Sequence, residues 1–254
     1  MFVRLALTAL LLAGAPAAAL AQSAPDRVSQ GDRSHAARDA VAALAHYEAA
    51  LAATPTNYDA LWKASREAVD IGEYVADRTQ RAALYARAES YARRAVETNP
   101  ADAEGHFALA RALGRSALTM GTRDRIRFAE EVRALALEAL RLDPTHAGAL
   151  HVMGVWNAEV MRLSGVERFI AKNLLGGQVF GEASWDDATR YLERAVTLEP
   201  NRITHRLDLA RVYADMDNRA RAREQLTRIA TTAAVEVNDV HYKREAAELL
   251  ERLR

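Results

Sequence analysis

The chain has 254 residues with 34 Lys and Arg against 34 Asp and Glu, so its formal net charge is zero. This balance argues against a general binder of nucleic acids or anionic membranes, because such proteins carry an excess of basic residues. The absence of cysteine excludes disulfides, thiolate metal sites and a thioether-linked lipid anchor. Half of the residues are hydrophobic but only 6% are aromatic, which favours closely packed, alanine-rich helices over a large aromatic core.

The first residues predict an export signal. Arg4 precedes an apolar run from Leu5 to Leu12, and the triplet Ala-Leu-Ala that ends at residue 21 matches a signal peptidase site. A membrane anchor is disfavoured, because the run is much shorter than the roughly 20 residues that span a bilayer. We expect residues 1–21 to be a cleaved signal peptide and residues 22–254 to be one periplasmic or secreted domain. No later segment approaches spanning length.

Four prolines divide the rest of the chain, and each ends the same short phrase. An alanine and a branched apolar residue stand five and four positions before Pro55, Pro100, Pro144 and Pro200. Because proline lacks the amide hydrogen and clashes with the preceding turn, each phrase predicts the end of a helix. The four copies indicate a repeat protein.

The first unit resembles the tetratricopeptide repeat, a pair of antiparallel helices of about 34 residues. Gly31, Ala43, Tyr47, Ala50 and Pro55 fall at the spacings of that family. The resemblance implies that the glycine and alanines let helices approach, that the tyrosine fills the gap to the neighbouring pair, and that the proline ends the second helix. The expected fold is all-α, a right-handed solenoid of antiparallel helix pairs with a capping helix at its C-terminus.

The later units are longer, since successive prolines are 45, 44 and 56 residues apart. We expect helix pairs at about 24–55, 56–100, 101–144, 145–200 and 201–232, an insertion at 164–183 in the fourth pair, and a cap at 235–254. Within the pairs, apolar spacing predicts helices at 58–71, 79–97, 103–116, 124–142, 148–163 and from 203 to 213. Asp77 with Gln80 predicts a capping box, and Ser184 with Asp187 predicts the start of another helix. No strand is expected.

A narrower resemblance is carried by the segment from 146 to 253 and by a short stretch at 62–66, and it covers most of the mature chain. Its carriers are Leu-His-Val-Met-Gly-Val-Trp at 150–156, Val-Glu-Arg-Phe at 166–169, Ala-Ser-Trp-Asp-Asp-Ala at 183–188, Tyr-Leu-Glu-Arg-Ala at 191–195, and Trp-Lys-Ala-Ser-Arg at 62–66. These segments are similar to the regulator of microtubule dynamics family. The resemblance implies an elongated array of four to five pairs and a binding rather than a catalytic role. The microtubule role does not transfer to a chain with a bacterial-type export signal.

Residues at equal distance from each proline should stack into rows on the inner face of such an array. The eleventh position holds Arg66, Arg111, Val155 and Arg211. Three guanidinium groups in one row can grip carboxylates on acidic side chains or at the C-terminus of a peptide. The alternative is a solvated row that pairs with local acids such as Asp70.

The seventh position holds Trp62, Phe107, His151 and Leu207, one helical turn from the arginines on the same face. Apolar anchors beside cations are typical of a peptide groove. Alternatively, the aromatic residues pack against the neighbouring pair or under the insertion. The candidate partner-binding residues are Trp62, Arg66, Phe107, Arg111, His151 and Arg211.

The insertion from Ser164 to Ala183 is the least repeat-like part of the chain. Its apolar residues have helical spacing and end at Gly176-Gly177. They are Val166, Phe169, Ile170, Leu174 and Leu175. Three interpretations of this apolar stripe are open, namely that it fills the groove, that it docks on a partner, or that it contacts a membrane.

Catalytic motifs are absent, including a Walker loop, a nucleophile elbow and a His-Glu-x-x-His zinc signature. His146 and His151 are five residues apart and do not share a helix face. We therefore assign no catalytic residue, cofactor or metal ligand. The expected function is a non-enzymatic, exported scaffold that binds a protein or peptide in its groove. The alternative is a structural or envelope-assembly protein that self-associates through the insertion.

Overall fold

The computed structural model describes residues 23–165, 167 and 178–254. These residues form helices joined by short turns, without any strand. The helices are α1 (Ala24–Ala36), α2 (Ala40–Ala53), α3 (Tyr58–Tyr74), α4 (Arg78–Thr98), α5 (Ala103–Ala117), α6 (Thr122–Leu142), α7 (Ala147–Arg162), the 3-10 helix η1 (Gln178–Glu182), α9 (Trp185–Leu198), α10 (Ile203–Asp215), α11 (Arg219–Thr231) and α12 (Asp239–Arg252). The bounds of α3, α4, α5, α6, α7 and α10 lie within a few residues of those predicted from apolar spacing.

The helices begin and end where local chemistry dictates. The side chain of Asp77 accepts a hydrogen bond from the backbone N–H of Gln80 at 2.8 Å, and Ser184 accepts one from Asp187 at 3.0 Å. These contacts confirm that Asp77 and Ser184 cap their helices. Four helices, α2, α4, α6 and α9, end two residues before a proline of the repeated phrase. The prolines therefore lie in the turns that join successive pairs.

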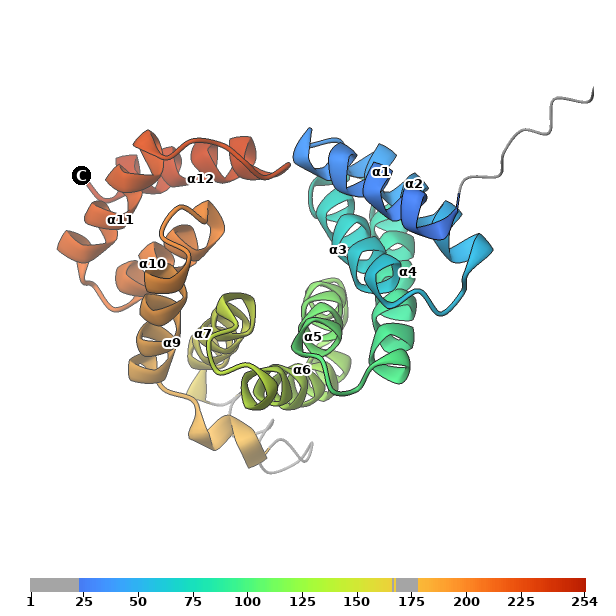
Figure 1. Ribbon diagram of the computed structural model, residues 1–254. Helices are drawn as coiled ribbons and strands as arrows, with labels where there is room; N and C mark the ends of the chain where they lie inside the picture. The colour runs from blue at the N-terminus through green and yellow to red at the C-terminus, as the bar shows by residue number, and fades with distance from the viewer. Residues whose placement is uncertain (1–22, 166, 168–177) are drawn as a thin grey trace, which may run out of the picture.

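Consecutive helices pack in pairs, α1 with α2, α3 with α4, α5 with α6, α7 with α9, and α10 with α11. Figure 1 shows α3, α5, α7 and α10 on the inner side of a curved array, with their partners outside. The prediction of an all-α solenoid is confirmed. The array curves so far that α12 comes round to the side of α1 and α3 (Figure 1), and the described part of the chain approaches a closed ring.

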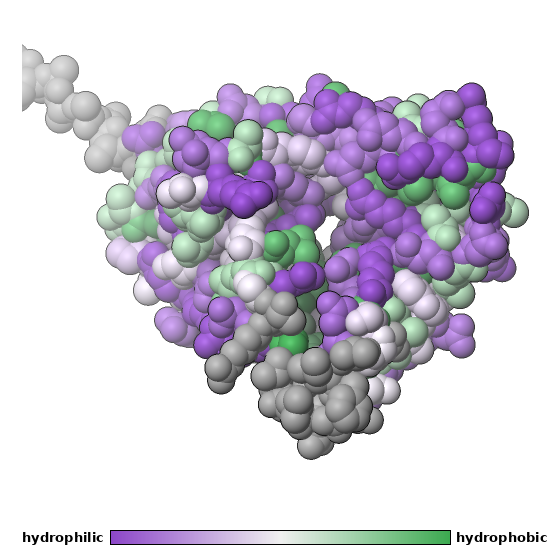
Figure 2. Space-filling view, turned by 180° about the vertical axis from the view of Figure 1, so that it is seen from behind, coloured by the Kyte–Doolittle hydropathy of each residue, from purple (hydrophilic) through white to green (hydrophobic). Residues whose placement is uncertain are grey.

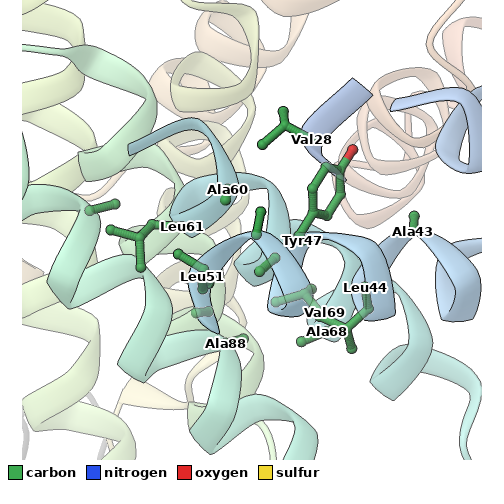
Figure 3. Packing of buried hydrophobic residues seen from close by; sticks show 14 of the residues in the cluster. Val28, Ala43, Leu44, Tyr47, Leu51, Ala60, Leu61, Ala68, Val69 and Ala88 are labelled. Atoms are coloured by element: carbon green, nitrogen blue, oxygen red, sulfur yellow. The ribbon is translucent and has the colours of Figure 1, made fainter. Parts of the chain in front are cut away.

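Small residues let the helices approach closely, as Figure 3 shows for the first core cluster. Ala60, Ala64 and Ala68 along α3 are completely buried. The fully buried ring of Tyr47 lies over Gly31, where an added Cβ would come within 2.3 Å of the ring. The tyrosine thus packs against a glycine of its own pair, a placement that the repeat spacing alone did not predict.

The insertion is described only in part. Its apolar residues Val166, Phe169, Ile170, Leu174 and Leu175 lie outside the described residues, as does the expected signal peptide at 1–21. The described end of the insertion is η1, whose Phe180 is 2% exposed and stacks on Trp156 of α7 with 5.9 Å between ring centroids. This end packs into the protein core. No helix among the described residues combines the length and apolar composition of a membrane span.

The close approach of α7 and α9 can be tested at Gly154. A Cβ there would lie 2.4 Å from Leu192 Cγ and 3.1 Å from the carbonyl oxygen of Ala188. We expect Gly154→Ala to lower the free energy of unfolding by roughly 1 to 3 kcal/mol, because the backbone oxygen cannot move aside. Gly114→Ala is the matched control, since nothing lies within 4 Å of its added Cβ. That control should gain up to about 1 kcal/mol from helix propensity. Urea unfolding followed by circular dichroism measures both, and equal effects would contradict the packing.

Candidate functional site

The inner face of the array encloses a cavity of about 690 Å³. The first helices of four pairs, α3, α5, α7 and α10, line it together with α6 and α12. Figure 2 shows a hollow at the centre of the molecule, with hydrophobic residues on one side and hydrophilic residues on the other. Because four successive pairs contribute apolar and charged side chains to this concave space, we treat it as the candidate site.

All six predicted residues line this cavity. Trp62 and Arg66 come from α3, Phe107 and Arg111 from α5, His151 from α7 and Arg211 from α10. Counting from the prolines therefore identified the inner face correctly. The exception in the rows is Leu207, which is 1% exposed and belongs to the core between α10, α11 and α12. Its neighbour Asp208 lines the cavity in its place.

Each arginine of the predicted row already holds a carboxylate of this chain. Arg66 Nε lies 2.8 Å from Glu67 Oε1, and Arg111 Nη2 lies 2.5 Å from Asp70 Oδ1. Arg211 binds two acids, which are Asp208 at 2.7 Å and Glu245 of α12. Pairing with local acids, the alternative expected for Asp70, is thus what the structure contains. The pair of Arg111 and Asp70 is largely buried, since its side chains are 19% and 9% exposed, whereas Arg211 is 39% exposed.

Pairing keeps these side chains ionised although burial favours their neutral forms. Burial opposes the charged form of Arg111, but the carboxylate of Asp70 more than offsets this and raises the pKa of Arg111 above its usual value. Burial likewise opposes ionisation of Asp208, whereas the hydrogen bond and charge of His151, together with Arg211, lower the pKa of Asp208. The inner wall is therefore a set of charged pairs that largely neutralise one another.

The two aromatic residues serve both packing and cavity surface. Trp62 is half-buried, with Lys63 Nζ 5.4 Å and Arg66 Cζ 5.3 Å from its ring centroid. Phe107 packs on Gly148 of α7, where an added Cβ would come within 2.5 Å of the ring. The expected contact with a neighbouring pair is therefore present for Phe107. Both rings still line the cavity.

Histidines gather where α7 and α10 begin. His151 Nε2 lies 2.8 Å from Asp208 Oδ2, and the His151 ring centroid lies 4.6 Å from that of His205. His205 is 3% exposed, and burial lowers its pKa to about 4 although Glu199 acts in the opposite direction. His146 instead caps α7, because its Nδ1 accepts the N–H of Ala149 at 3.0 Å. The described residues contain no group of three acids or histidines arranged to hold a metal ion.

Residues of α3 and α12 that the sequence pattern does not mark join the two sides of the ring. Tyr74 donates its hydroxyl to Glu245 of α12 at 2.8 Å, and Tyr242 of α12 donates its hydroxyl to Glu73 at 2.8 Å. Asn238 Nδ2 donates to the Asp70 carbonyl at 3.0 Å. No pattern could have found these contacts, because α12 follows no proline and belongs to neither row.

Arg115 is a second omission, although its position was informative. It lies four residues after Arg111, on the same face of α5, and its Nη2 lies 2.7 Å from Glu73 Oε1. Extending each row by one helical turn along the inner helix would have found it. Arg115 lines the cavity with the predicted arginines.

A family model described as regulator of microtubule dynamics protein 1-3 matches residues 26–254. The chain belongs to this family. Regulator of microtubule dynamics protein 1 of Bos taurus is 27% identical over 192 residues, which are 75% of this chain and 60% of that protein. The Homo sapiens protein is 26% identical over 191 residues, 74% of this chain and 60% of that protein. The matched region thus spans about three fifths of the length of these relatives.

Among solved structures, a thermophilic TPR protein of Thermus thermophilus is similar to this family member over 90% of the present chain and all of the other. The TM-score is 0.63 and the sequence identity is 21%. A likeness at this identity concerns the fold, and it agrees with the tetratricopeptide architecture described above.

The ion pair between Arg111 and Asp70 yields a stability prediction. We expect Arg111→Met to lower the free energy of unfolding by roughly 3 to 5 kcal/mol, because Asp70 is left buried without its cation. Adding Asp70→Asn should recover much of this loss, since the amide carries no charge. Urea unfolding of the wild type, both single variants and the double variant gives the coupling energy. Additive single effects would show that the pair is not coupled.

The burial of His205 yields a pH prediction. Its pKa is about 4 in the folded chain and 6.5 ordinarily, so the unfolded chain binds more protons between these values. The free energy of unfolding should therefore fall on acidification through this window, by on the order of 3 kcal/mol from this group. His146, whose pKa is raised, acts in the opposite direction. The measurement is urea unfolding of wild type and His205→Gln at pH 7 and pH 4. A wild-type loss no larger than that of the variant would contradict the prediction.

Proposed function

We propose that this chain is a non-enzymatic, exported scaffold that binds a peptide or protein segment in the cavity of its inner face. The observation that carries the proposal is the cavity of about 690 Å³, to which the first helices of four successive pairs contribute side chains. Helical arrays of this kind use their concave face for recognition. Export rests on the sequence pattern at the N-terminus.

The size of the cavity limits the ligand. Pockets of a few hundred to a thousand Å³ enclose drug-sized ligands. A short extended segment with its side chains fits such a volume, whereas a folded domain does not. The partner is therefore expected to insert one segment, and the remainder of the partner stays outside the ring.

The apolar wall supplies the anchoring surface. Trp62 of α3, Phe107 of α5, and Val155 and Trp156 of α7 contribute to this wall. Truncating a well-buried anchor at such a surface costs roughly 1 to 3 kcal/mol of binding free energy. We expect an apolar or aromatic side chain of the partner to lie here.

The arginines have a different part in the proposal. A carboxylate of the partner would have to replace Asp70 or Asp208, which already hold Arg111 and Arg211. Exchange of one acid for another adds little net affinity, although it fixes the direction of the bound segment. Acidic groups on the partner would thus give specificity, and the apolar anchors would give most of the affinity.

Self-association through the insertion has no comparable support. The described end of the insertion buries Phe180 against Trp156 instead of presenting it to solvent. The role that the relatives' names state, regulation of microtubule dynamics, is theirs, and nothing in the cavity selects that partner for this chain.

Site-specific photocrosslinking tests the proposal. A photoreactive benzoylphenylalanine replaces half-buried Val155 on the cavity wall, and in a matched control it replaces Val240 on α12, which is 64% exposed. After irradiation of cells, mass spectrometry should find crosslinks from position 155 to one recurring peptide segment, and none of that segment from position 240.

Addition of Trp62→Ala to the position 155 variant should lower the yield of this crosslink several-fold, because an anchor of the segment is lost. Circular dichroism shows whether the variant keeps its helices. The same crosslinks at positions 155 and 240, or a yield that Trp62→Ala leaves unchanged, would overturn the assignment of the cavity as the binding site.

A further inference from the structure

We propose that the contact between α3 and α12 is a latch whose opening gives access to the cavity and is coupled to the cavity arginines. This inference rests on the proposed function, because it concerns how the same site admits its ligand. The latch consists of Tyr74 and Glu73 on α3 with Tyr242 and Glu245 on α12, supported by Asn238.

The latch is made by side chains that join two independently packed parts. Tyr242 and Ala246 bury α12 against α10 and α11, in a cluster with Leu207, Leu226 and Ile229. Leu61 and Val69 bury α3 in another cluster with α1, α2 and α4. Tyr74 of α3 also packs against the cluster that holds α12, so its ring must leave that cluster when the latch opens. Each helix otherwise keeps its own hydrophobic core, and the ring can open without unfolding a pair.

Aromatic rings also pack against one another where α3 meets α12. The Tyr74 ring stacks on His241 with 3.9 Å between centroids and meets the edge of Tyr242 at 6.1 Å. We call the contact between α3 and α12 the seam. The two tyrosines donate their hydroxyls across it in opposite directions, one from each helix. Both hydrogen bonds must break together when the seam opens.

The two carboxylates of the latch also line the cavity. Glu73 accepts the Tyr242 hydroxyl and pairs with Arg115 of α5 at 2.7 Å. Glu245 accepts the Tyr74 hydroxyl and pairs with Arg211 of α10. Each carboxylate therefore accepts a tyrosine hydroxyl from across the seam and also pairs with an arginine that lines the cavity.

Because each carboxylate has both partners, the hydrogen bonds across the seam are coupled to the arginines of the cavity. An anionic group that draws Arg115 or Arg211 toward itself removes the cation that fixes a latch carboxylate, and the hydrogen bond across the seam weakens. By thermodynamic reciprocity, an open seam frees the same arginines for an anionic group. The arginines that are internally paired in the closed ring are thus the ones that opening makes available.

Distance measurements between spin labels test the latch without any partner. The chain has no cysteine, so Val41→Cys and Val240→Cys create the only two thiols, at positions 66% and 64% exposed on either side of the seam. Val41 lines a shallow hollow over the seam together with Tyr74 and Asn238. Double electron-electron resonance should give one short distance in the otherwise wild-type chain.

Tyr74→Phe with Tyr242→Phe removes both hydroxyls across the seam and keeps both rings. The ratio of long to short distances should rise about fivefold for each single variant and about 30-fold for the pair. Tyr213→Phe is the matched control, because its hydroxyl also binds a glutamate, Glu193, but joins α10 to α9 away from the seam. Unchanged distances in the double variant, or an equal change in the control, would overturn the latch.

Arg115→Gln with Arg211→Gln tests the coupling. Neither arginine binds across the seam, so a latch made of hydroxyl contacts alone would keep its short distance. Coupling through the shared carboxylates instead predicts that the ratio of long to short distances rises several-fold. Glu73→Gln with Glu245→Gln, which keeps an oxygen acceptor for each hydroxyl, should behave in the same way.

Circular dichroism of each labelled variant checks the helix content, and the glutamine pair at 73 and 245 replaces the arginine pair if the latter does not fold. Short distances in folded charge variants would overturn the coupling. Since no partner enters these measurements, the latch and the coupling can fail while crosslinking at Val155 still supports the binding site, and the reverse also holds.

Discussion

Charge compensation on the inner wall is the constraint on which the rest of the structure depends. Arg111 with Asp70 and Arg115 with Glu73 join α3 to α5, and Arg211 with Glu245 joins α10 to α12. Because a partly buried charge without a partner is costly, these helices must keep their relative positions. Small residues allow the inner helices to approach, and the ion pairs then fix how they face the cavity.

The sequence predicted most of the fold because its signals are local. Proline position, capping side chains such as Asp77 and Ser184, and apolar spacing each act within a few residues of a helix end, so the helix bounds followed from them. The phase of the inner helices followed as well, which is why all six candidate residues line one cavity. The curvature of the array could not follow, since it accumulates from small rotations between pairs that no single residue encodes.

The sequence predicted which residues line the candidate site, but it predicted only in part which acids pair with its arginines. Equal spacing placed Arg66, Arg111 and Arg211 in a row, whereas the acids that hold them come from irregular positions, among them Glu245 of α12. Leu207 shows the limit of counting, because it lies in the core and its neighbour Asp208 lines the cavity. Pairing between helices far apart in sequence depends on the three-dimensional curve and not on any local pattern.

The hydrogen bonds between α3 and α12 join residues 169 and 171 positions apart in the chain. In a linear array of repeats each unit contacts only its neighbours, so folding can begin anywhere and unfolding proceeds from the ends. Here the second pair and the C-terminal helix protect each other, and the first pair also reaches the C-terminal part, because Arg38 between α1 and α2 donates to the Ala234 carbonyl at 3.3 Å. Since the distant contact requires every pair between them to be formed, it must come late in folding. The ring thereby gives a modular chain the long-range cooperativity of a globular protein.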